Sequence, residues 1–104
     1  MNRLSDQQKY LNIIGLATRA NKVTVGEDQI LRDIQKGRAK LLLLANNIGP
    51  NSLKKLTDKS KFYQVPYRIV ADRDELSHAI GQVGRVAIVI TDKGFADKIS
   101  SLLD

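Results

Sequence analysis

Hydrophobic residues recur along the chain at two spacings, and each spacing predicts a different kind of element. In some segments apolar side chains return every three or four residues, as at Tyr10, Ile14 and Ala17, which is the period of one helix face. Segments 40–45 and 86–90 are instead apolar almost without a break. A short run of this kind is typical of a strand that is buried on both faces. The pattern therefore predicts central strands covered by amphipathic helices.

Nine elements are predicted, and local signals define several of their ends. Ser5 with Gln8 matches the capping box that begins a helix, and Asp72 with Glu75 repeats that pattern later in the chain. Gly37 matches the glycine that often follows a helix. We predict helices over 5–19, 27–36, 50–60, 72–80 and 92–103, and strands over 22–25, 40–45, 66–70 and 86–90.

The alternation of helices with strands predicts an α/β fold, more specifically a three-layer α/β/α sandwich. Its four-stranded sheet would be mixed or mostly parallel, with about five helices on its two faces. The 104 residues have the size of one domain, and no repeat, linker or low-complexity tract interrupts them. We therefore expect a single domain over residues 1–104.

The composition argues against several classes of protein. The chain has no cysteine and a single histidine, His78, which disfavours a disulfide scaffold, a thiol nucleophile and a metal site. No apolar run approaches the roughly 20 residues of a membrane span, and the first residues lack the apolar stretch of a secretory signal. We expect a soluble, cytoplasmic protein without a bound metal or a membrane partner.

Basic residues outnumber acidic ones, 17 to 11, and give the chain a net charge of +6. A basic surface binds polyanions by releasing their counterions, although it also keeps an ordinary protein soluble. One basic segment contains Lys54, Lys55, Lys59 and Lys61. The neighbouring Phe62 and Tyr67 are predicted to be core residues, and Tyr63 is left open between core packing and base stacking.

Candidate catalytic residues are scarce. Four polar residues gather at one predicted helix start: Asp72, Asp74, Glu75 and His78. Glu75 and His78, one turn apart, could serve acid–base chemistry, but helix capping and the helix dipole also account for these acids. Neither G-x-x-x-x-G-K-[ST] nor G-x-G-x-x-G occurs in the sequence. We favour the structural interpretation and expect no enzyme activity and no cofactor.

A glycine between a predicted strand and a predicted helix marks the strongest candidate binding site. Gly26 would let another backbone come close, and the start of the helix offers free N–H groups that suit phosphate. The polar side chains that follow are Glu27, Asp28, Gln29, Arg32 and Lys36. Acidic residues at the start and basic residues at the end also stabilise an ordinary helix dipole. Spacing alone leaves both interpretations open.

Stretches along nearly the whole chain resemble one family of RNA-binding proteins. The sequence is similar to the kink-turn RNA-binding superfamily, which includes archaeal ribosomal and small nucleolar RNA proteins. It is most similar to small bacterial ribosomal-protein-like members of the YlxQ type. The matching stretches are LNIIGLATRA at 11–20, GEDQILR at 26–32, GRAKLLLLA at 37–45, VPY at 65–67, ELSHAIG at 75–81 and ITDKGF at 90–95. Their unbroken order implies the family's α/β/α sandwich and an RNA partner, either a kink-turn or ribosomal RNA.

The family's G-x-N-E-x-x-K motif falls on four positions of this chain. By resemblance, Gly26 admits the RNA backbone, while Asp28 and Gln29 face the guanines of tandem sheared G·A pairs. Gln29 replaces a carboxylate with an amide that can still accept a hydrogen bond, and Arg32 keeps the charge of the family lysine in a planar fork. Asp28 is the larger departure, because asparagine donates and accepts whereas an ionised aspartate only accepts.

A second family contact is a loop that packs on a flipped-out base, which falls here on residues 81–86. By resemblance, Val83 and Val86 supply apolar contacts and Gly84 allows close approach, while Arg85 clamps a phosphate. A tight turn between a helix and a strand would explain the same glycines.

The leading hypothesis is a non-catalytic module that binds a bent, structured RNA element, expected to be a kink-turn in ribosomal RNA or another structured RNA. The alternative belongs to another class of function. In it, the same fold has lost kink-turn readout and serves protein interaction, with the acidic turn from Glu27 to Gln29 engaging a basic partner. The two hypotheses differ most at Asp28, because the alternative expects an asparagine there to strengthen kink-turn binding greatly.

Overall fold

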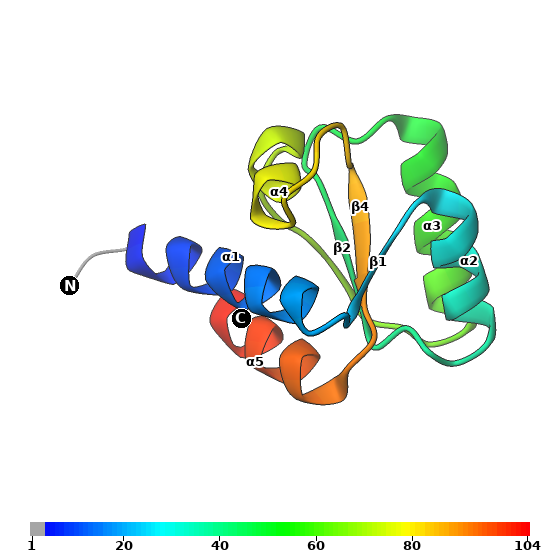
Figure 1. The fold of residues 1–104 in the computed structure, drawn as a ribbon. Coiled ribbons are helices and arrows are strands. Elements are labelled where there is room, and N and C mark those ends of the chain that lie inside the picture. The colour runs from blue at the N-terminus through cyan, green and yellow to red at the C-terminus, as the bar shows by residue number, and fades with distance from the viewer. Residues whose placement is uncertain (1–3) are drawn as a thin grey trace.

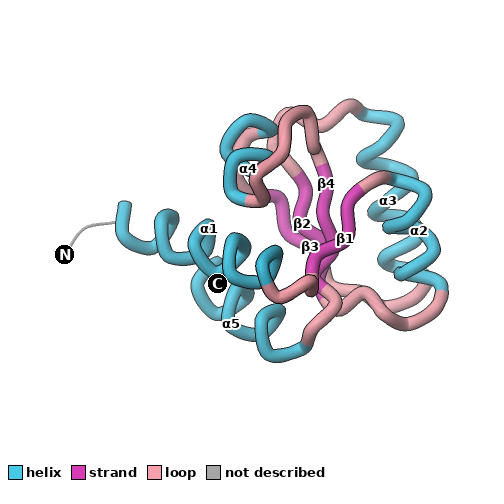
Figure 2. Tube along the Cα trace, in the orientation of Figure 1, coloured by secondary structure: helices cyan, strands magenta, loops and turns pink. Residues whose placement is uncertain are grey.

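The computed structural model describes residues 4–104, with side chains from residue 7 onward. Its five helices are α1 (Leu4–Arg19), α2 (Glu27–Gln35), α3 (Pro50–Phe62), α4 (Arg73–Ala79) and α5 (Lys93–Leu103). Its four strands are β1 (Val23–Val25), β2 (Leu41–Leu44), β3 (Tyr67–Ile69) and β4 (Ala87–Ile90). This order confirms the predicted alternation, as Figures 1 and 2 show.

The four strands form one mixed sheet in the order β1-β4-β2-β3. β4 lies antiparallel to both β1 and β2, and only β2 and β3 pair in parallel. The mixed sheet is therefore confirmed, and the mostly parallel alternative does not hold. Helix–strand alternation fixes which elements are joined along the chain, but it does not fix which strands become neighbours.

Helices cover both faces of the sheet, with α1, α4 and α5 on one face and α2 and α3 on the other (Figure 1). Alternate residues of the central strands supply the two cores. Leu41 and Leu43 pack toward α1 and α5, whereas Leu42 and Leu44 pack toward α2 and α3. All four side chains are fully buried. The uninterrupted apolar run in the sequence is thus explained by burial on both faces.

Two of the three predicted helix signals are found in the structure. Asp72 accepts a hydrogen bond from the N–H of Glu75 at 2.8 Å, and Glu75 returns the contact in a full capping box. Gly37 has φ +76°, the left-handed conformation that follows many helices. α1 begins at Leu4, one residue before the predicted cap at Ser5. The Ser5 side chain lies outside the described residues.

The two aromatic residues predicted to be core residues differ in their burial. Tyr67 is half-buried against the core under α3, but 78% of Phe62 is exposed, so that prediction is wrong for Phe62. The inward face of α3 carries Leu56 and Ser60. Phe62 follows Ser60 by two residues, which is about 200° around the helix axis. It therefore points away from the sheet. Tyr63 is 39% exposed.

Strand direction gives the molecule two distinct ends. β1 and β2 both run opposite to β4, and β3 runs with β2, so β1, β2 and β3 share one direction. They finish at the Gly26 end, which comprises residues 26–29, 46–50, 71–73 and 81–86. The Phe62 end is opposite and comprises residues 36–40 and 59–64, where α2 and α3 finish.

Within residues 4–104, no helix is both long enough and apolar enough to cross a membrane.

Candidate nucleic-acid interface

Gly26 forms the junction between β1 and α2. Its φ of 90° and ψ of 127° lie where side chains are strongly disfavoured, and a Cβ added there would meet no atom within 4 Å. The position therefore needs glycine for its backbone angles, and the space beside it is open. Among the side chains that the structure describes, none caps α2. Its first N–H groups consequently remain available to an external acceptor.

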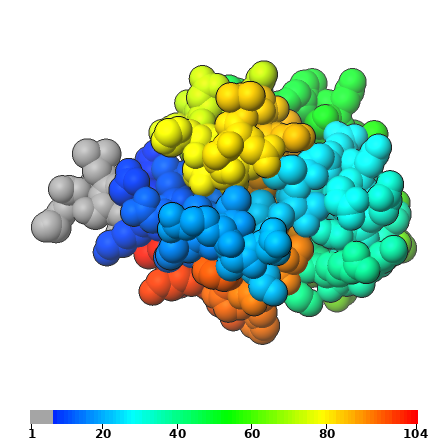
Figure 3. All heavy atoms as spheres, viewed as in Figure 1, coloured from blue at the N-terminus to red at the C-terminus, as the bar shows by residue number. Residues whose placement is uncertain are grey.

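Strand pairing brings the predicted loop over residues 81–86 beside Gly26. Val25 at the end of β1 pairs with Ile88 of β4, so the residues just after β1 adjoin those just before β4. The two segments line one small cavity of about 90 Å³, together with Ile30, Leu56 and Ala87 beneath them. In Figure 3 the start of α2 (cyan) borders the surface of this loop (yellow to orange). The structure therefore joins two candidate segments that lie far apart in the sequence.

A buried serine holds the loop over residues 81–86 in place. The hydroxyl of Ser77 accepts from the N–H of Arg85 at 2.8 Å and donates to the Arg85 carbonyl at 3.1 Å. Gly81 and Gly84 have φ near +70°, as tight turns require. Such a loop can present a side chain without ordering a flexible backbone first.

The side chains of this loop are not equally available. Val83 is 89% exposed and projects from its tip. Val86 is half-buried and packs against the core under α1 and α4, although it also lines the cavity beside Gly26. The Nε of Arg85 donates to Gln82 at 2.9 Å, which orients its guanidinium. Val83 is therefore the most exposed apolar side chain of this loop.

Asp28, Gln29 and Arg32 are exposed on α2. The Arg32 Nη1 donates to the Gln29 Oε1 at 3.0 Å. This contact uses one lone pair of the amide oxygen and leaves the Gln29 NH₂ group directed elsewhere as a donor. At the position of the family glutamate, an acceptor, this chain therefore presents donors as well. No hydrogen bond to the Asp28 side chain is seen within the described residues.

Glu27 is engaged inside the molecule. Its Oε1 accepts from the Ser52 hydroxyl at 3.0 Å, and its Oε2 accepts from the Lys55 Nζ at 2.9 Å. The hydrogen bond from Lys55 is the main reason that the pKa of Glu27 is lowered, and the hydroxyl of Ser52 adds to it. These bonds tie the start of α2 to α3. Sequence spacing gave no sign of them, because both partners lie 25 or more residues away.

Lys36 lies apart from the other predicted site residues. It is the C-cap of α2, ten residues beyond Gly26 and about 15 Å along the helix axis at 1.5 Å per residue. The structure therefore brings Gly26 and Glu27 beside the loop over residues 81–86. Gln29 instead lines a separate hollow with Asp33 and Arg38, and Lys36 lies at the Phe62 end.

Arg73 adds a cation that was not recognised in the sequence. Its N–H donates to the Asn47 side chain at 2.9 Å, which joins two loops of the Gly26 end. Its guanidinium lies 3.4 Å from the Cβ position of Gly84. Arg73 is exposed and adds a cation beside the loop that carries the half-buried Arg85. Its position as the first residue of α4 gave no local signal, because basic residues are uncommon at helix starts.

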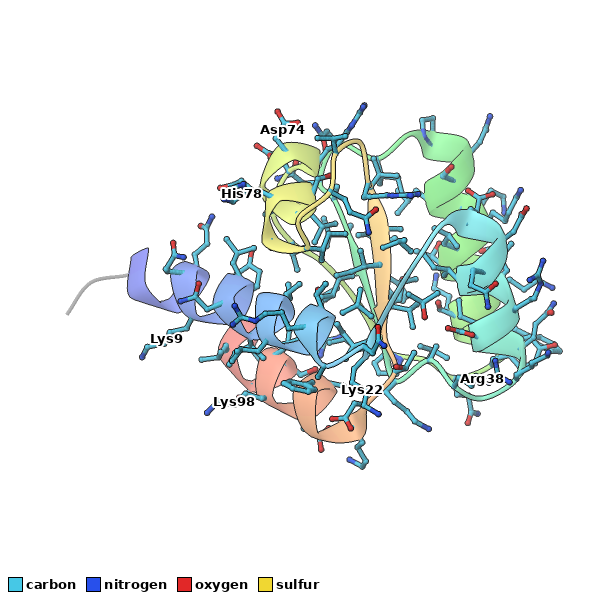
Figure 4. The ribbon with its side chains drawn as sticks, in the orientation of Figure 1. Lys9, Lys22, Arg38, Asp74, His78 and Lys98 are labelled. Carbon is cyan, nitrogen blue, oxygen red and sulfur yellow. The ribbon has the colours of Figure 1, made fainter. Side chains whose placement is uncertain are left out.

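The acids and the histidine of α4 are arranged as capping and surface groups. Asp72 and Glu75 form the capping box, and the Glu75 Oε2 also accepts from Gln7 at 3.0 Å. Asp74 and His78 are exposed and point outward from the helix (Figure 4). Within residues 7–104, no group of three or more histidine or acidic side chains is placed to hold a metal ion.

Comparisons of sequence and of structure with known proteins both found similar proteins. Residues 8–100 match the model of the ribosomal protein L7Ae/L30e/S12e/Gadd45 family. The chain is 46% identical over 96 residues to the RNA-binding protein YlxQ of Bacillus subtilis, a match that covers 92% of this chain and 96% of that protein. It is 28% identical over 91 residues to the large ribosomal subunit protein eL8 of Thermoplasma volcanium, a match that covers 84% of this chain and 73% of that protein. A solved structure of a Bacillus halodurans C protein of unknown function superposes with a TM-score of 0.89 at 40% sequence identity. The superposition covers 92% of this chain and 97% of that one.

Proposed function

Because the chain belongs to the ribosomal protein L7Ae/L30e/S12e/Gadd45 family, we propose that it is an RNA-binding protein that acts without catalysis. Its target is a kink-turn with tandem sheared G·A pairs, in ribosomal RNA or another structured RNA. The names of its relatives support RNA as the partner, since one is an RNA-binding protein and another is a ribosomal protein. A ribosomal target would place the protein in the cytoplasm, bound to the ribosome stably or transiently.

The observation that carries the proposal is the meeting of Gly26 with the loop over residues 81–86. A kink-turn presents a sharply bent backbone and an extruded base close together. The Gly26 end offers an open glycine and uncapped N–H groups to the first feature, and the exposed Val83 to the second. One concave surface would thus contact both features at once.

Each side chain then has a specific role. Asp28 and Gln29 face the sheared pairs across the first turn of α2. Arg32 and Arg85 bind phosphate, with Arg73 as an added cation beside Gly84. Glu27 keeps α2 against α3 through Ser52 and Lys55. Lys36 contacts phosphate only in an RNA that continues along α2.

The proposal is tested by calorimetric titration with a generic kink-turn RNA at two salt concentrations. The matched control is the same RNA with its tandem G·A pairs replaced by Watson–Crick pairs. We expect tight binding to the kink-turn and weak, strongly salt-dependent binding to the control, because only phosphate contacts remain there. Equal, weak binding to both RNAs would contradict the proposal.

The protein-interaction alternative is weakened by the contacts of Glu27. That carboxylate already binds Ser52 and Lys55 of its own chain, so the acidic turn keeps only Asp28 as an exposed carboxylate. Asp28 is the one feature that still favours the alternative, since its charge opposes phosphate.

A further inference from the structure

Two aromatic rings are exposed at the Phe62 end, far from the proposed kink-turn site. Phe62 is 78% and Tyr63 is 39% exposed, and their ring centroids lie 4.9 Å apart in an edge-to-face arrangement. Neither ring contributes to the two buried cores. Single exposed apolar residues are common, but an exposed pair of aromatic rings in contact is typical of a binding surface.

The backbone below these rings is well ordered. At the end of α3, the N–H of Tyr63 donates to the Lys59 carbonyl at 3.0 Å, and the N–H of Gln64 donates to the Lys61 carbonyl at 3.2 Å. Gln64 has φ +61°, and the N–H of Val65 then bonds the Ser60 carbonyl at 2.8 Å. The last carbonyls of the helix are thus satisfied. The rings are held on a closed helix end.

Several basic side chains lie at the same end of the molecule as the two rings. Lys59 and Lys61 lie on the same turn as Phe62, and α2, packed against α3, brings Lys36 and Arg38 to the same end. Arg38 lies at the lower right of Figure 4, where α2 finishes in Figure 1.

The acids of this region are already used. Asp33 is buried and accepts from Thr24 at 2.6 Å, and Asp58 is paired with Lys54 at 2.7 Å. The ion pairs seen among the described side chains leave out Lys59 and Lys61. The positive charge of these two lysines is therefore available to an external anion.

We propose that the Phe62 end is a second RNA contact, which binds a single-stranded segment. Phe62 and Tyr63 stack on bases, while Lys59 and Lys61 bind the flanking phosphates. Aromatic rings beside cations suit single strands because every base offers a π-face, whatever the sequence. The inference rests on the proposed RNA-binding function, and it adds a site that a folded kink-turn at the Gly26 end would leave free.

The test uses an eight-nucleotide oligoadenylate, which cannot form a kink-turn. The chain contains no tryptophan, so Phe62→Trp places a single tryptophan in the site. We expect saturable quenching of this tryptophan by the oligonucleotide. Titration of labelled oligoadenylate should show about tenfold weaker binding for Phe62→Ala/Tyr63→Ala, while kink-turn affinity stays within about twofold. Both residues are exposed, so the thermal unfolding midpoint should show that the variant remains folded.

A charge-matched pair of variants separates a specific site from general attraction. Lys59→Glu/Lys61→Glu should weaken oligoadenylate binding about tenfold or more, because two phosphate contacts are lost and two repulsions are added. Lys9→Glu/Lys98→Glu makes the same charge change elsewhere, on α1 and α5 (Figure 4). This control should bind nearly as the unchanged chain does.

Distinct outcomes separate this inference from the proposed function. Absent quenching, or equal losses in both charge variants, would overturn the second contact even if kink-turn binding is tight. Quenching without kink-turn selectivity would leave the second contact standing and overturn the kink-turn proposal alone. A response of the tryptophan to an acidic protein but not to oligoadenylate would assign the surface to a protein partner and overturn the inference.

Discussion

The Gly26 end and the Phe62 end are built from the two termini of the same helices, yet they offer opposite chemistry. α2 starts after Gly26 without a side-chain cap, so its first N–H groups are free, and the surface beside it is concave. At the other end the carbonyls of α2 and α3 are satisfied by their caps, and large exposed side chains stand on them. A helix start can bind phosphate through its backbone, whereas a helix end has only its side chains to offer. The polarity of the helices thus decides which contact each end can make.

Charge reversal on α2 should give the largest effect. We expect Arg32→Glu to weaken kink-turn binding about 100-fold, because a charge-assisted bond to phosphate is lost and a repulsion replaces it. The matched variant Lys36→Glu changes the same charge at the Phe62 end and should cost less than about fivefold. Calorimetry with one kink-turn RNA compares the two. Equal losses of affinity would mean that general electrostatic attraction, and not a contact specific to α2 near the Gly26 end, explains both effects.

Two glycines with positive φ provide a second comparison. Gly26 and Gly37 have φ of 90° and 76°, and neither has an atom within 4 Å of an added Cβ. Alanine at either position should lower the free energy of unfolding by about 1 kcal/mol, because both residues would be held in a left-handed region. Only Gly26→Ala should weaken RNA binding, by about tenfold, since its methyl group would stand between the helix start and the RNA. Chemical denaturation and RNA titration of both variants test this, and unchanged RNA affinity for Gly26→Ala would remove Gly26 from the interface.

Asp28 is an exposed acid at the end that is proposed to hold phosphate. Asp28→Asn should tighten kink-turn binding about tenfold, because it removes one negative charge and restores a side chain that donates as well as accepts. Affinity for the Watson–Crick control RNA should rise much less. If the unchanged chain barely binds and the variant binds tightly, the protein-interaction alternative gains support. A loss of affinity would show that the carboxylate itself takes part in readout.

The smallest expected effect concerns the tie between α2 and α3 at the Gly26 end. Hydrogen bonds from Lys55 and Ser52 lower the pKa of Glu27 below its ordinary value of 4.5. A lowered carboxyl pKa stabilises the folded state above the unfolded-state pKa, and this contribution is lost as pH falls through the folded-state value. Glu27→Gln should therefore be less stable near pH 7 by under about 1 kcal/mol. The difference should vanish at pH values well below 4.5, as measured by urea denaturation, and a difference that persists there would exclude ionisation as its cause.

Within the candidate site, the sequence identified the parts but not how they meet. Gly26, Asp28, Gln29 and Arg32 follow one another along one helix start, so spacing alone placed them together. The loop over residues 81–86 could be recognised only by its glycines. No local signal identified Ser52, Lys55 and Arg73, because their roles depend on contacts with distant parts of the chain. Arg73 lies 11 residues from Gly84, and the partners of Glu27 lie 25 or more residues from it.

The sequence by itself determined what local interactions control. These are the order of elements, the capping box at Asp72, the end of α2 before Gly37 and the burial of β2 on both faces. Tertiary structure alone decided that β4 would enter between β1 and β2, running opposite to both. It also engaged Glu27 inside the molecule and left Phe62 exposed. The reason is physical, since caps and periodicity act within a turn or two, whereas strand pairing joins segments more than 60 residues apart, such as Val25 with Ile88.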